Sequence, residues 1–134
     1  MAVNTKTEYA LRALIAIAEA GHLSAQKISE SKKLPKKYIE HLLSLLKAAD
    51  LINSSTGSTG GYELSKAPGE ISFQDVLDAV DDKSYATACT HRFGKFCLGQ
   101  DCTLSPFFSE LDHRLQGIMQ SYTLEDIIDL WKRE

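Results

Sequence analysis

The sequence has no apolar run long enough to cross a membrane and no secretory leader at its start. The longest apolar stretch, residues 10–18, is interrupted by Arg12 and is too short to span a bilayer. The first residues also lack the order of basic, apolar and small residues that marks a signal peptide. We therefore expect a cytoplasmic protein without a membrane partner.

The sequence also lacks the short motifs by which common enzyme classes are recognised. It has no glycine motif that cradles phosphate, no G-x-S-x-G elbow and no H-E-x-x-H zinc motif. None of its scattered histidines stands in a triad-like context; they are His22, His41, His91 and His113. We therefore predict that the protein is not an enzyme.

Cysteine is scarce, and all three copies lie between Cys89 and Cys102. An odd number of cysteines in so short a segment makes a poor disulfide framework. In a reducing compartment, such a cluster is better interpreted as metal ligands or redox-active thiols.

Negative charge exceeds positive charge over the whole chain, which has a net charge of -3. The positive charge is unevenly distributed along the sequence. Residues 1–66 carry a net +3 and residues 67–134 a net -6. Within eleven residues only Glu30 opposes a lysine group made of Lys27, Lys32, Lys33, Lys36 and Lys37. Such asymmetry predicts one surface that faces nucleic acid, with a solvated lysine-rich turn as the plainer alternative.

Apolar periodicity predicts three helices in the first fifty residues. The first begins after Asn4 or Thr5 and ends at Gly21, and the second, shorter helix is capped by Ser24. Pro35 suits the first position of the third helix, where its missing N–H has no partner to lose. The third helix has a wide apolar stripe, formed by Tyr38, Ile39, Leu42, Leu43, Leu45 and Leu46. The last two helices and the turn between them make a helix-turn-helix.

A β-hairpin is predicted directly after the third helix. Residues 51–55 and 62–64 have strand character, and residues 56–61 between them are rich in turn formers. We expect Gly57, Gly60 and Gly61 to allow positive φ angles at the hairpin tip and a close approach of backbone N–H groups to phosphates. A helix-turn-helix followed by such a hairpin is a winged helix.

The second half contains a capped helix, an irregular loop and a long apolar-striped helix. Ser72, with Asp75 three residues on, begins a helix, whereas residues 83–102 have no clean period. A long helix follows from Thr103, and Thr123 caps a last one. The stripe of the long helix packs either against a second copy or within one chain; it comprises Phe107, Phe108, Leu111, Leu115, Ile118, Met119 and Tyr122.

These patterns predict a mainly α fold with a small β-hairpin wing and a long C-terminal dimerisation helix. We expect a winged helix-turn-helix DNA-binding domain over residues 1–82, a cysteine loop over 83–102, and the dimerisation helix with the C-terminal helix over 103–134. Helices that read the major groove present their N-terminal residues to base edges while flanking groups hold phosphates. The predicted DNA-binding residues are Lys27, Lys33, Lys36, Lys37, Tyr38, Glu40, His41, Ser58, Thr59 and Gly60. The plainer alternative for the third helix is an exposed polar face.

Several of these segments resemble one family of bacterial transcription regulators. Residues 6–12 (KTEYALR), 35–42 (PKKYIEHL), 59–64 (TGGYEL), 71–79 and 123–124 resemble the Rrf2 family, which includes the IscR-like and NsrR-like iron–sulfur regulators. The resemblance covers nearly the whole chain. It implies a homodimer that binds a near-palindromic operator in double-stranded DNA, with the third helix in the major groove and the wing at the flanking groove.

The resemblance also implies an iron–sulfur cluster held by Cys89, Cys97 and Cys102, of the two-iron or the four-iron type. Thiolates are the usual cluster ligands, and a cluster needs about four ligands in total. Three cysteines leave one position for a weak ligand, which nitric oxide, oxygen or cluster loss can displace. The spacing is C-x7-C-x4-C, and its last interval is one residue shorter than is usual in the family.

The family offers two patterns for the fourth cluster ligand. The first is a histidine three residues after the last cysteine, and it fails because that position is Ser105. The second is an acidic residue of the first helix, given by the partner subunit, and Glu8 stands at that place. The plainer alternative for Glu8 is an ion pair with Arg12 one turn on. His91 is a further candidate ligand.

Three other interpretations of the cysteines remain open. Cys89, His91, Cys97 and Cys102 are a possible zinc set, although the short C-x2-C knuckle is missing. The thiols are alternatively a metal-free redox sensor, or buried apolar residues, which their polar neighbours disfavour. We therefore predict a DNA-binding transcription regulator that senses redox, nitric oxide or iron–sulfur status, with a cluster-dependent repressor or dual regulator as the first hypothesis. The alternative is a cofactor-free or zinc-containing regulator controlled by thiol oxidation or by a partner protein.

Overall fold

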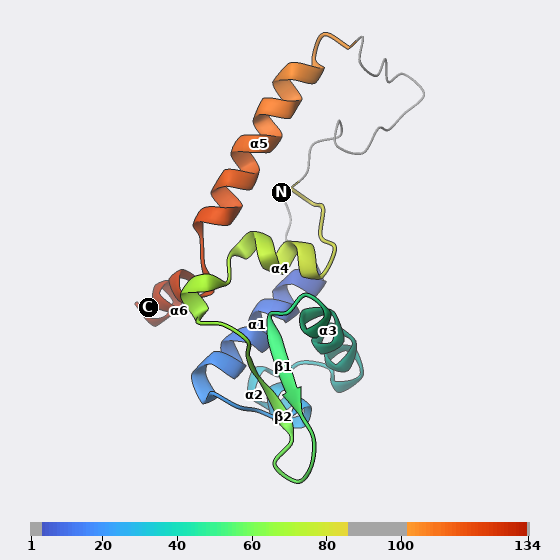
Figure 1. Ribbon diagram of the computed structural model, residues 1–134, viewed down its shortest axis with the longest axis vertical. Coiled ribbons are helices and arrows are strands. Elements are labelled where there is room, and N and C mark those ends of the chain that lie inside the picture. Colours follow the sequence, from blue (N-terminus) through green and yellow to red (C-terminus); the bar gives the residue numbers. More distant parts are fainter. Residues whose placement is uncertain (1–3, 86–101, 134) are drawn as a thin grey trace.

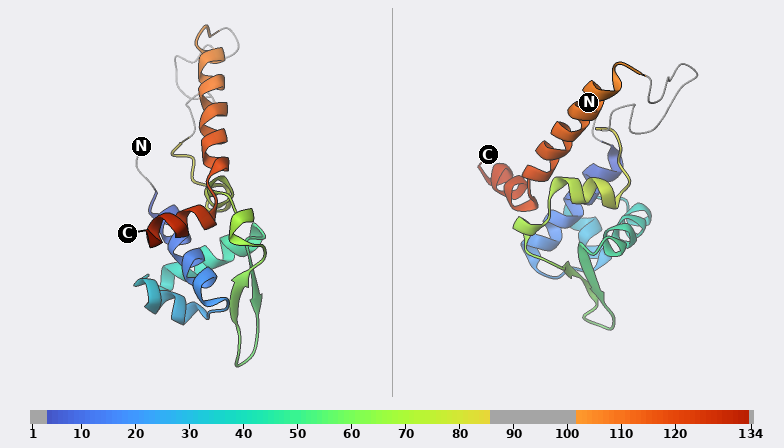
Figure 2. Two further views of the ribbon diagram at one scale, coloured as in Figure 1. Left: turned by 90° about the vertical axis from the view of Figure 1, so that its left-hand side faces the viewer. Right: turned by 45° about the horizontal axis from the view of Figure 1, so that its top comes forward.

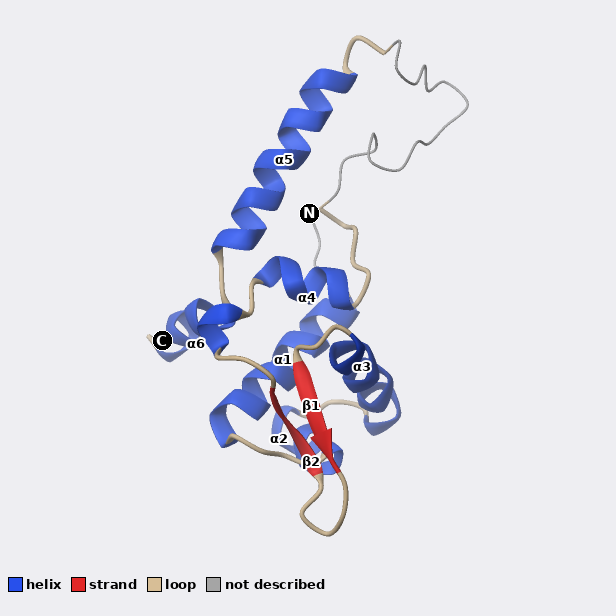
Figure 3. Cartoon of the chain, in the orientation of Figure 1, coloured by secondary structure: helices blue, strands red, loops and turns tan. Residues whose placement is uncertain are grey.

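The computed structural model describes residues 4–85 and 102–133 of the chain. It is mostly helical and carries one two-stranded antiparallel hairpin, as predicted (Figures 1 and 3). The elements in chain order are α1 (Thr5–Ala20), α2 (Ala25–Lys32), α3 (Lys36–Ala48), β1 (Ile52–Ser55), β2 (Gly61–Leu64), a short 3-10 helix η1 (Pro68–Glu70), α4 (Phe73–Ala79), α5 (Ser105–Ser121) and α6 (Leu124–Lys132). No described helix is long and apolar enough to cross a membrane.

Local chemistry sets the ends of most helices where the sequence predicts them. The Asn4 side chain accepts a hydrogen bond from the Lys6 N–H, and Gly21 ends α1 with φ 81°. Ser24 caps α2. Ser72 and Thr123 each form a capping box, in which the side chains of the cap and of the third helical residue exchange hydrogen bonds with each other's backbone N–H groups.

Pro35 does not occupy the first position of α3, which corrects the prediction. The helix begins at Lys36, and Pro35 is the N-cap residue with extended ψ, 121°. Its carbonyl accepts hydrogen bonds from the Tyr38 and Ile39 N–H groups, so it begins the helical ladder from just outside the helix. The preceding turn passes through Lys33, whose φ of 53° is left-handed.

One core joins the helix-turn-helix to the C-terminal helix. It is built from α1, α2, α3 and β1, and Ile71, Val76 and Val80 extend it to the α4 region. Leu124 and Ile128 complete it from α6, which returns to pack against α1. The largest fully buried side chains among the described residues are Leu14, Ile17, Ile28, Ile39, Leu42, Leu43, Leu46, Leu51, Ile52, Ile71, Leu77 and Leu124.

The hairpin pairs Ile52 with Leu64 at its base and Ser55 with Gly61 near its tip. The prediction that all three tip glycines use positive φ is wrong, because only Gly57 does, at 101°. Position 61 requires glycine because there is no room for a side chain: a Cβ there would lie 2.6 Å from the Leu23 carbonyl oxygen. At Gly60 it would lie 2.9 Å from the carbonyl oxygens of Gly57 and Ser55.

Helix α5 projects away from the rest of the molecule as an arm (Figures 1 and 2). Among the described elements its main neighbour is α4. Its predicted stripe is largely exposed, with 57% of Phe107 and 51% of Ile118 accessible to solvent. Packing within the described part of the chain therefore does not bury this stripe.

Candidate nucleic-acid interface and sensing segment

The first two turns of α3 present polar side chains on one face and core residues on the other. Lys36, Lys37, Glu40 and His41 are exposed, whereas Ile39 and the leucines at positions 42, 43 and 46 are buried. The burial of one face fixes the rotation of the helix, so its polar face must point outward. No acidic residue lies in the first turn, so two lysines dominate the charge at this end of α3.

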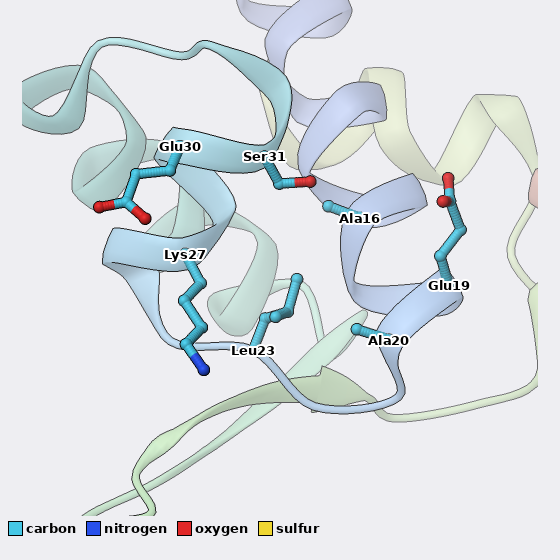
Figure 4. A pocket seen from close by; sticks show the side chains of 7 residues that line it. All are labelled: Ala16, Glu19, Ala20, Leu23, Lys27, Glu30 and Ser31. Carbon is cyan, nitrogen blue, oxygen red and sulfur yellow. The ribbon is translucent and has the colours of Figure 1, made fainter.

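Lys27 and Lys33 are the exposed cations nearest to α3 in the chain. Lys27 also lines a shallow groove of about 560 Å³ between α1 and α2, with Glu19 and Glu30 among the other lining residues. Figure 4 shows Lys27 and Glu30 extending in different directions from α2. Lys27 therefore stays available as a cation on this surface.

Lys32 differs from the other lysines of the group. Its ammonium nitrogen lies 3.2 Å from a Glu19 carboxylate oxygen and 5.0 Å from the ring centre of Trp131. The side chain is only 20% exposed. Lys32 therefore joins α2 to α1 and α6 and contributes little to the free basic surface.

The Tyr38 side chain is half-buried and packs against helix α1. Its ring meets that of Tyr9 edge to face, with centroids 5.6 Å apart. Such aromatic pairs contribute about 0.5–1.5 kcal/mol beyond the apolar area that they bury. Of the residues predicted to bind DNA, Tyr38 therefore has a structural role in seating α3.

The wing carries the remaining predicted residues: Ser58 and Thr59 are exposed at its tip, and Gly60 is half-buried. Its second strand, β2, is attached to the segment between α1 and α2 by two backbone hydrogen bonds, which Leu23 and Tyr62 exchange at 3.0 and 2.7 Å. The His22 Nε2 lies 3.2 Å from the Ser55 hydroxyl oxygen. The sequence patterns did not reveal this attachment, because Leu23 lies outside any strand-like run.

Only one of the three predicted thiol ligands lies among the described residues. Cys102 is a free, half-buried thiol three residues before α5, whereas Cys89, His91 and Cys97 lie outside the described residues. Within residues 4–85 and 102–133, no three His, Cys, Asp or Glu side chains are grouped to hold a metal ion.

Glu8 forms the ion pair that its spacing to Arg12 predicts. Its carboxylate lies 2.5 Å from the Arg12 guanidinium, and both side chains are about half exposed, at 51% and 44%. The Arg12 guanidinium also lies 5.8 Å from the ring centre of Tyr9. An exposed pair of this kind is worth about 0–1 kcal/mol, so Glu8 can exchange its partner at little cost.

A buried polar cluster joins α1 to the start of the predicted cysteine loop. The Thr7 hydroxyl, which is fully buried, donates to Asp82 Oδ2 at 2.5 Å. The other carboxylate oxygen accepts from the Ser84 N–H at 2.9 Å and from its hydroxyl at 2.6 Å. Burial alone would raise the pKa of Asp82, but the bonds from Ser84 and Thr7 outweigh it and hold the pKa below its usual value of 3.8.

The sequence patterns missed this cluster. Thr7 continues the buried α1 series that runs through Ala10, Leu14 and Ile17, which is the one available sign of a hidden partner. A hydroxyl on an apolar face needs an acceptor, but nothing in the sequence identifies Asp82 as that acceptor.

Three comparisons place the chain among known proteins. Residues 3–130 match the family described as "Rrf2: Iron-dependent Transcriptional regulator". The HTH-type transcriptional regulator IscR of Citrobacter koseri is 34% identical over 133 residues, which cover 96% of this chain and 80% of that protein.

Among solved structures, CymR (YrzC), the global cysteine regulator of B. subtilis, superposes with a TM-score of 0.75 at 24% identity, over 97% of this chain and 98% of that one. The oxidized form of Staphylococcus aureus CymR gives a TM-score of 0.68 at 25% identity, over 95% of each chain. Both superpositions support the overall fold described above.

Proposed function

The chain belongs to the Rrf2 family of transcriptional regulators, and on this premise we propose that it is a homodimer whose affinity for operator DNA depends on the state of its three-cysteine loop. Its curated relatives are helix-turn-helix regulators, so the chain is a regulator and not an enzyme. The observation that carries the proposal is the exposed, lysine-bearing N-terminal end of α3.

The DNA-binding step uses α3 and the wing together. The exposed end of α3 enters the major groove, where Glu40 and His41 reach base edges and Lys36 and Lys37 neutralise phosphates. Lys27 and Lys33 bind the flanking backbone, and Ser58, Thr59 and Gly60 bring the wing to the neighbouring groove. Half-buried Tyr38 acts indirectly, because its contact with Tyr9 seats the helix.

The dimer is formed through α5. The stripe along this arm exposes Phe107, Leu111, Ile118 and Tyr122, and a second copy of the same helix offers a matching apolar surface. A symmetric dimer presents two α3 helices to the DNA, so we expect a near-palindromic operator.

The sensing step uses Cys89, Cys97 and Cys102 as cluster ligands, with the partner subunit's Glu8 as the fourth. This set fits chemically, because thiolates are the usual cluster ligands and Glu8 is an exposed carboxylate whose ion pair is weak. A bound two-iron or four-iron cluster would supply iron that reacts with oxidants and nitric oxide. The description of the family as iron-dependent agrees with this assignment.

Anaerobic absorption spectra with iron, sulfide and zinc analysis test the sensing step. We expect brown protein with iron and sulfide, no colour in Cys97→Ala, and a changed spectrum in Glu8→Ala. Thr5→Val is the control, because it alters an exposed residue in the same turn as Glu8 without removing a ligand. Colour retained in Cys97→Ala would overturn the ligand assignment, and colourless protein with zinc would indicate a structural metal site instead.

A second candidate is control by thiol oxidation without a cofactor. It is favoured by the half-buried free thiol of Cys102 and by the existence of an oxidized form of the S. aureus relative. Under this hypothesis, peroxide and then a thiol reductant should change the DNA affinity reversibly in chelator-treated protein. Affinity that responds to iron loading but not to peroxide would exclude it.

A further inference from the structure

The cluster formed by Thr7, Asp82 and Ser84 lies between two parts of the proposed regulator. Thr7 belongs to the first turn of α1, and Asp82 and Ser84 lie at the start of the segment that leads to the cysteines. The two sides are separated by 75 positions in the sequence. Among the described contacts, the Thr7–Asp82 hydrogen bond ties this segment to α1, and the Asn4 backbone N–H bonds to the same carboxylate.

The backbone places Asp82 in a fixed position. Helix α4 ends at Ala79, and Asp81 then takes a left-handed φ of 54° that reverses the chain. The Asp82 N–H donates to the Leu77 carbonyl at 2.8 Å, which closes the end of the helix. The carboxylate is therefore held by its own backbone before it meets Thr7, and only 7% of the residue is exposed.

The segment after Asp82 is also held on its other side. Ser84 donates two hydrogen bonds to the Asp82 carboxylate, and the Tyr85 ring lies edge to face with that of Phe73, with centroids 6.1 Å apart. Residues 82–85 thus form a short stem that is docked on α4 and pinned to α1. Removing the Thr7 bond would leave the stem attached to α4 and, through the Asn4 backbone N–H that also bonds to the Asp82 carboxylate, only to the N-cap of α1.

Thr7 and Glu8 are neighbours on α1 that point in different directions. The Thr7 side chain is buried against Asp82, whereas Glu8 is exposed at the surface. The same turn therefore carries both the inward bond to this chain's own loop stem and the carboxylate that the proposed function assigns to the other subunit's cluster.

We propose that Thr7 and Asp82 are positioning residues that mechanically couple the cysteine loop to α1, so that a change of state in the loop alters DNA binding. This inference rests on the proposed function only in taking the loop as the sensing segment. The Thr7–Asp82 bond is the coupling element, and Ser84 holds the carboxylate in place for it.

The test compares Thr7→Val, which keeps the shape but removes the hydroxyl, with Thr7→Ser, which keeps the hydroxyl. The DNA dissociation constant is measured for full-length protein, iron–sulfide reconstituted or chelator-stripped. Allosteric couplings of this kind change affinity by about 5- to 150-fold. For the wild type we expect the dissociation constants of the reconstituted and the stripped protein to differ by a factor in that range. The ratio should fall to within about twofold of unity in Thr7→Val and be retained in Thr7→Ser. A full wild-type ratio in Thr7→Val would overturn the inference and leave the proposed function intact.

Hydrogen exchange of the stripped protein tests the coupling element without any cluster. Losing a buried bond to a carboxylate should speed exchange about tenfold, both in the first turns of α1 and in residues 82–85. Thr7→Ser and the exposed control Thr5→Val should leave both segments near the wild-type rates. Acceleration on one side only, or on neither, would show that the bond does not join the two segments. Failure of the wild type to take up iron or to change its DNA affinity counts against the proposed function alone.

Discussion

The double variant Lys36→Ala/Lys37→Ala should weaken DNA binding in a way that depends steeply on salt. Both lysines are exposed at the start of α3, so their removal disturbs no buried contact. Each phosphate contact releases counterions and contributes about 0.9 to the slope of log affinity against log salt. A dimer in which all four lysines contact phosphates should therefore lose about 3.6 from that slope.

This change in slope is large enough to measure on any duplex. As salt rises from about 50 to about 200 mM, the wild type should lose roughly 150-fold more affinity than the variant. Fluorescence anisotropy of a labelled duplex at several salt concentrations gives the slope directly, and the operator sequence need not be known. The readout concerns contact with the DNA backbone, so it is separate from any effect of the cysteine loop.

Lys47→Ala is the matched control, because it removes the same residue type from the last turn of the same helix. It lies eleven residues after Lys36, or about 16 Å along the helix axis. Its slope should stay close to that of the wild type. If Lys47→Ala lowered the slope as much as the double variant does, the N-terminal end of α3 would not be the end that meets the DNA.

Three further predictions concern stability and assembly. Gly61→Ala should destabilise the fold by about 1–3 kcal/mol, because its Cβ would meet the Leu23 carbonyl oxygen. Gly117→Ala, in open space on α5, should instead stabilise the fold by about 0.5–1 kcal/mol. Urea unfolding measures both free energies, and equal effects of the two substitutions would refute the steric argument. The Asp82 carboxylate has a lowered pKa, so its ionised form stabilises the fold above the unfolded-state value of 3.8, and this stabilisation is lost as the pH falls through the lower folded-state pKa. The stability advantage of the wild type over Asp82→Asn should thus be present at neutral pH and shrink in acid, and a constant difference between these two proteins across the acid range would contradict it. Ile118→Asp should convert the dimer to monomer in sedimentation analysis, because it places a charge in the exposed α5 stripe, and a dimer that persists would exclude this face as the interface.

Features that depend on neighbours in the sequence were predictable, and the four helix caps show why. Asn4, Ser24, Ser72 and Thr123 each bond to a backbone N–H two or three residues ahead, so the pattern and its partner lie together in the chain. The helix-turn-helix and the hairpin follow from the same local signals. Their order along the chain was enough to predict a winged helix.

Features that depend on distant partners were predicted wrongly or missed. Gly61 looked like a residue chosen for positive φ, but its lack of a side chain matters because the Leu23 carbonyl lies against it. The Thr7–Asp82 bond spans most of the described chain and has no sequence pattern of its own. Periodicity predicted the stripe on α5, but a stripe does not identify the surface that covers it.

Helix α4 is short and is held at both of its ends, which makes it the structural junction of the molecule. At its start, the Phe73 N–H donates to the Tyr122 carbonyl and the Leu124 N–H to the Ile71 carbonyl, both at 2.8 Å, so the corner between α5 and α6 is tied to the entry of α4. At its end, Asp82 is bonded to Thr7 of α1. A helix of seven residues fixed in this way cannot tilt without moving α1 or the base of the α5 arm. Under the proposed coupling, a change of state in the segment between α4 and α5 would therefore reach both α1 and the base of the α5 arm through the same short helix.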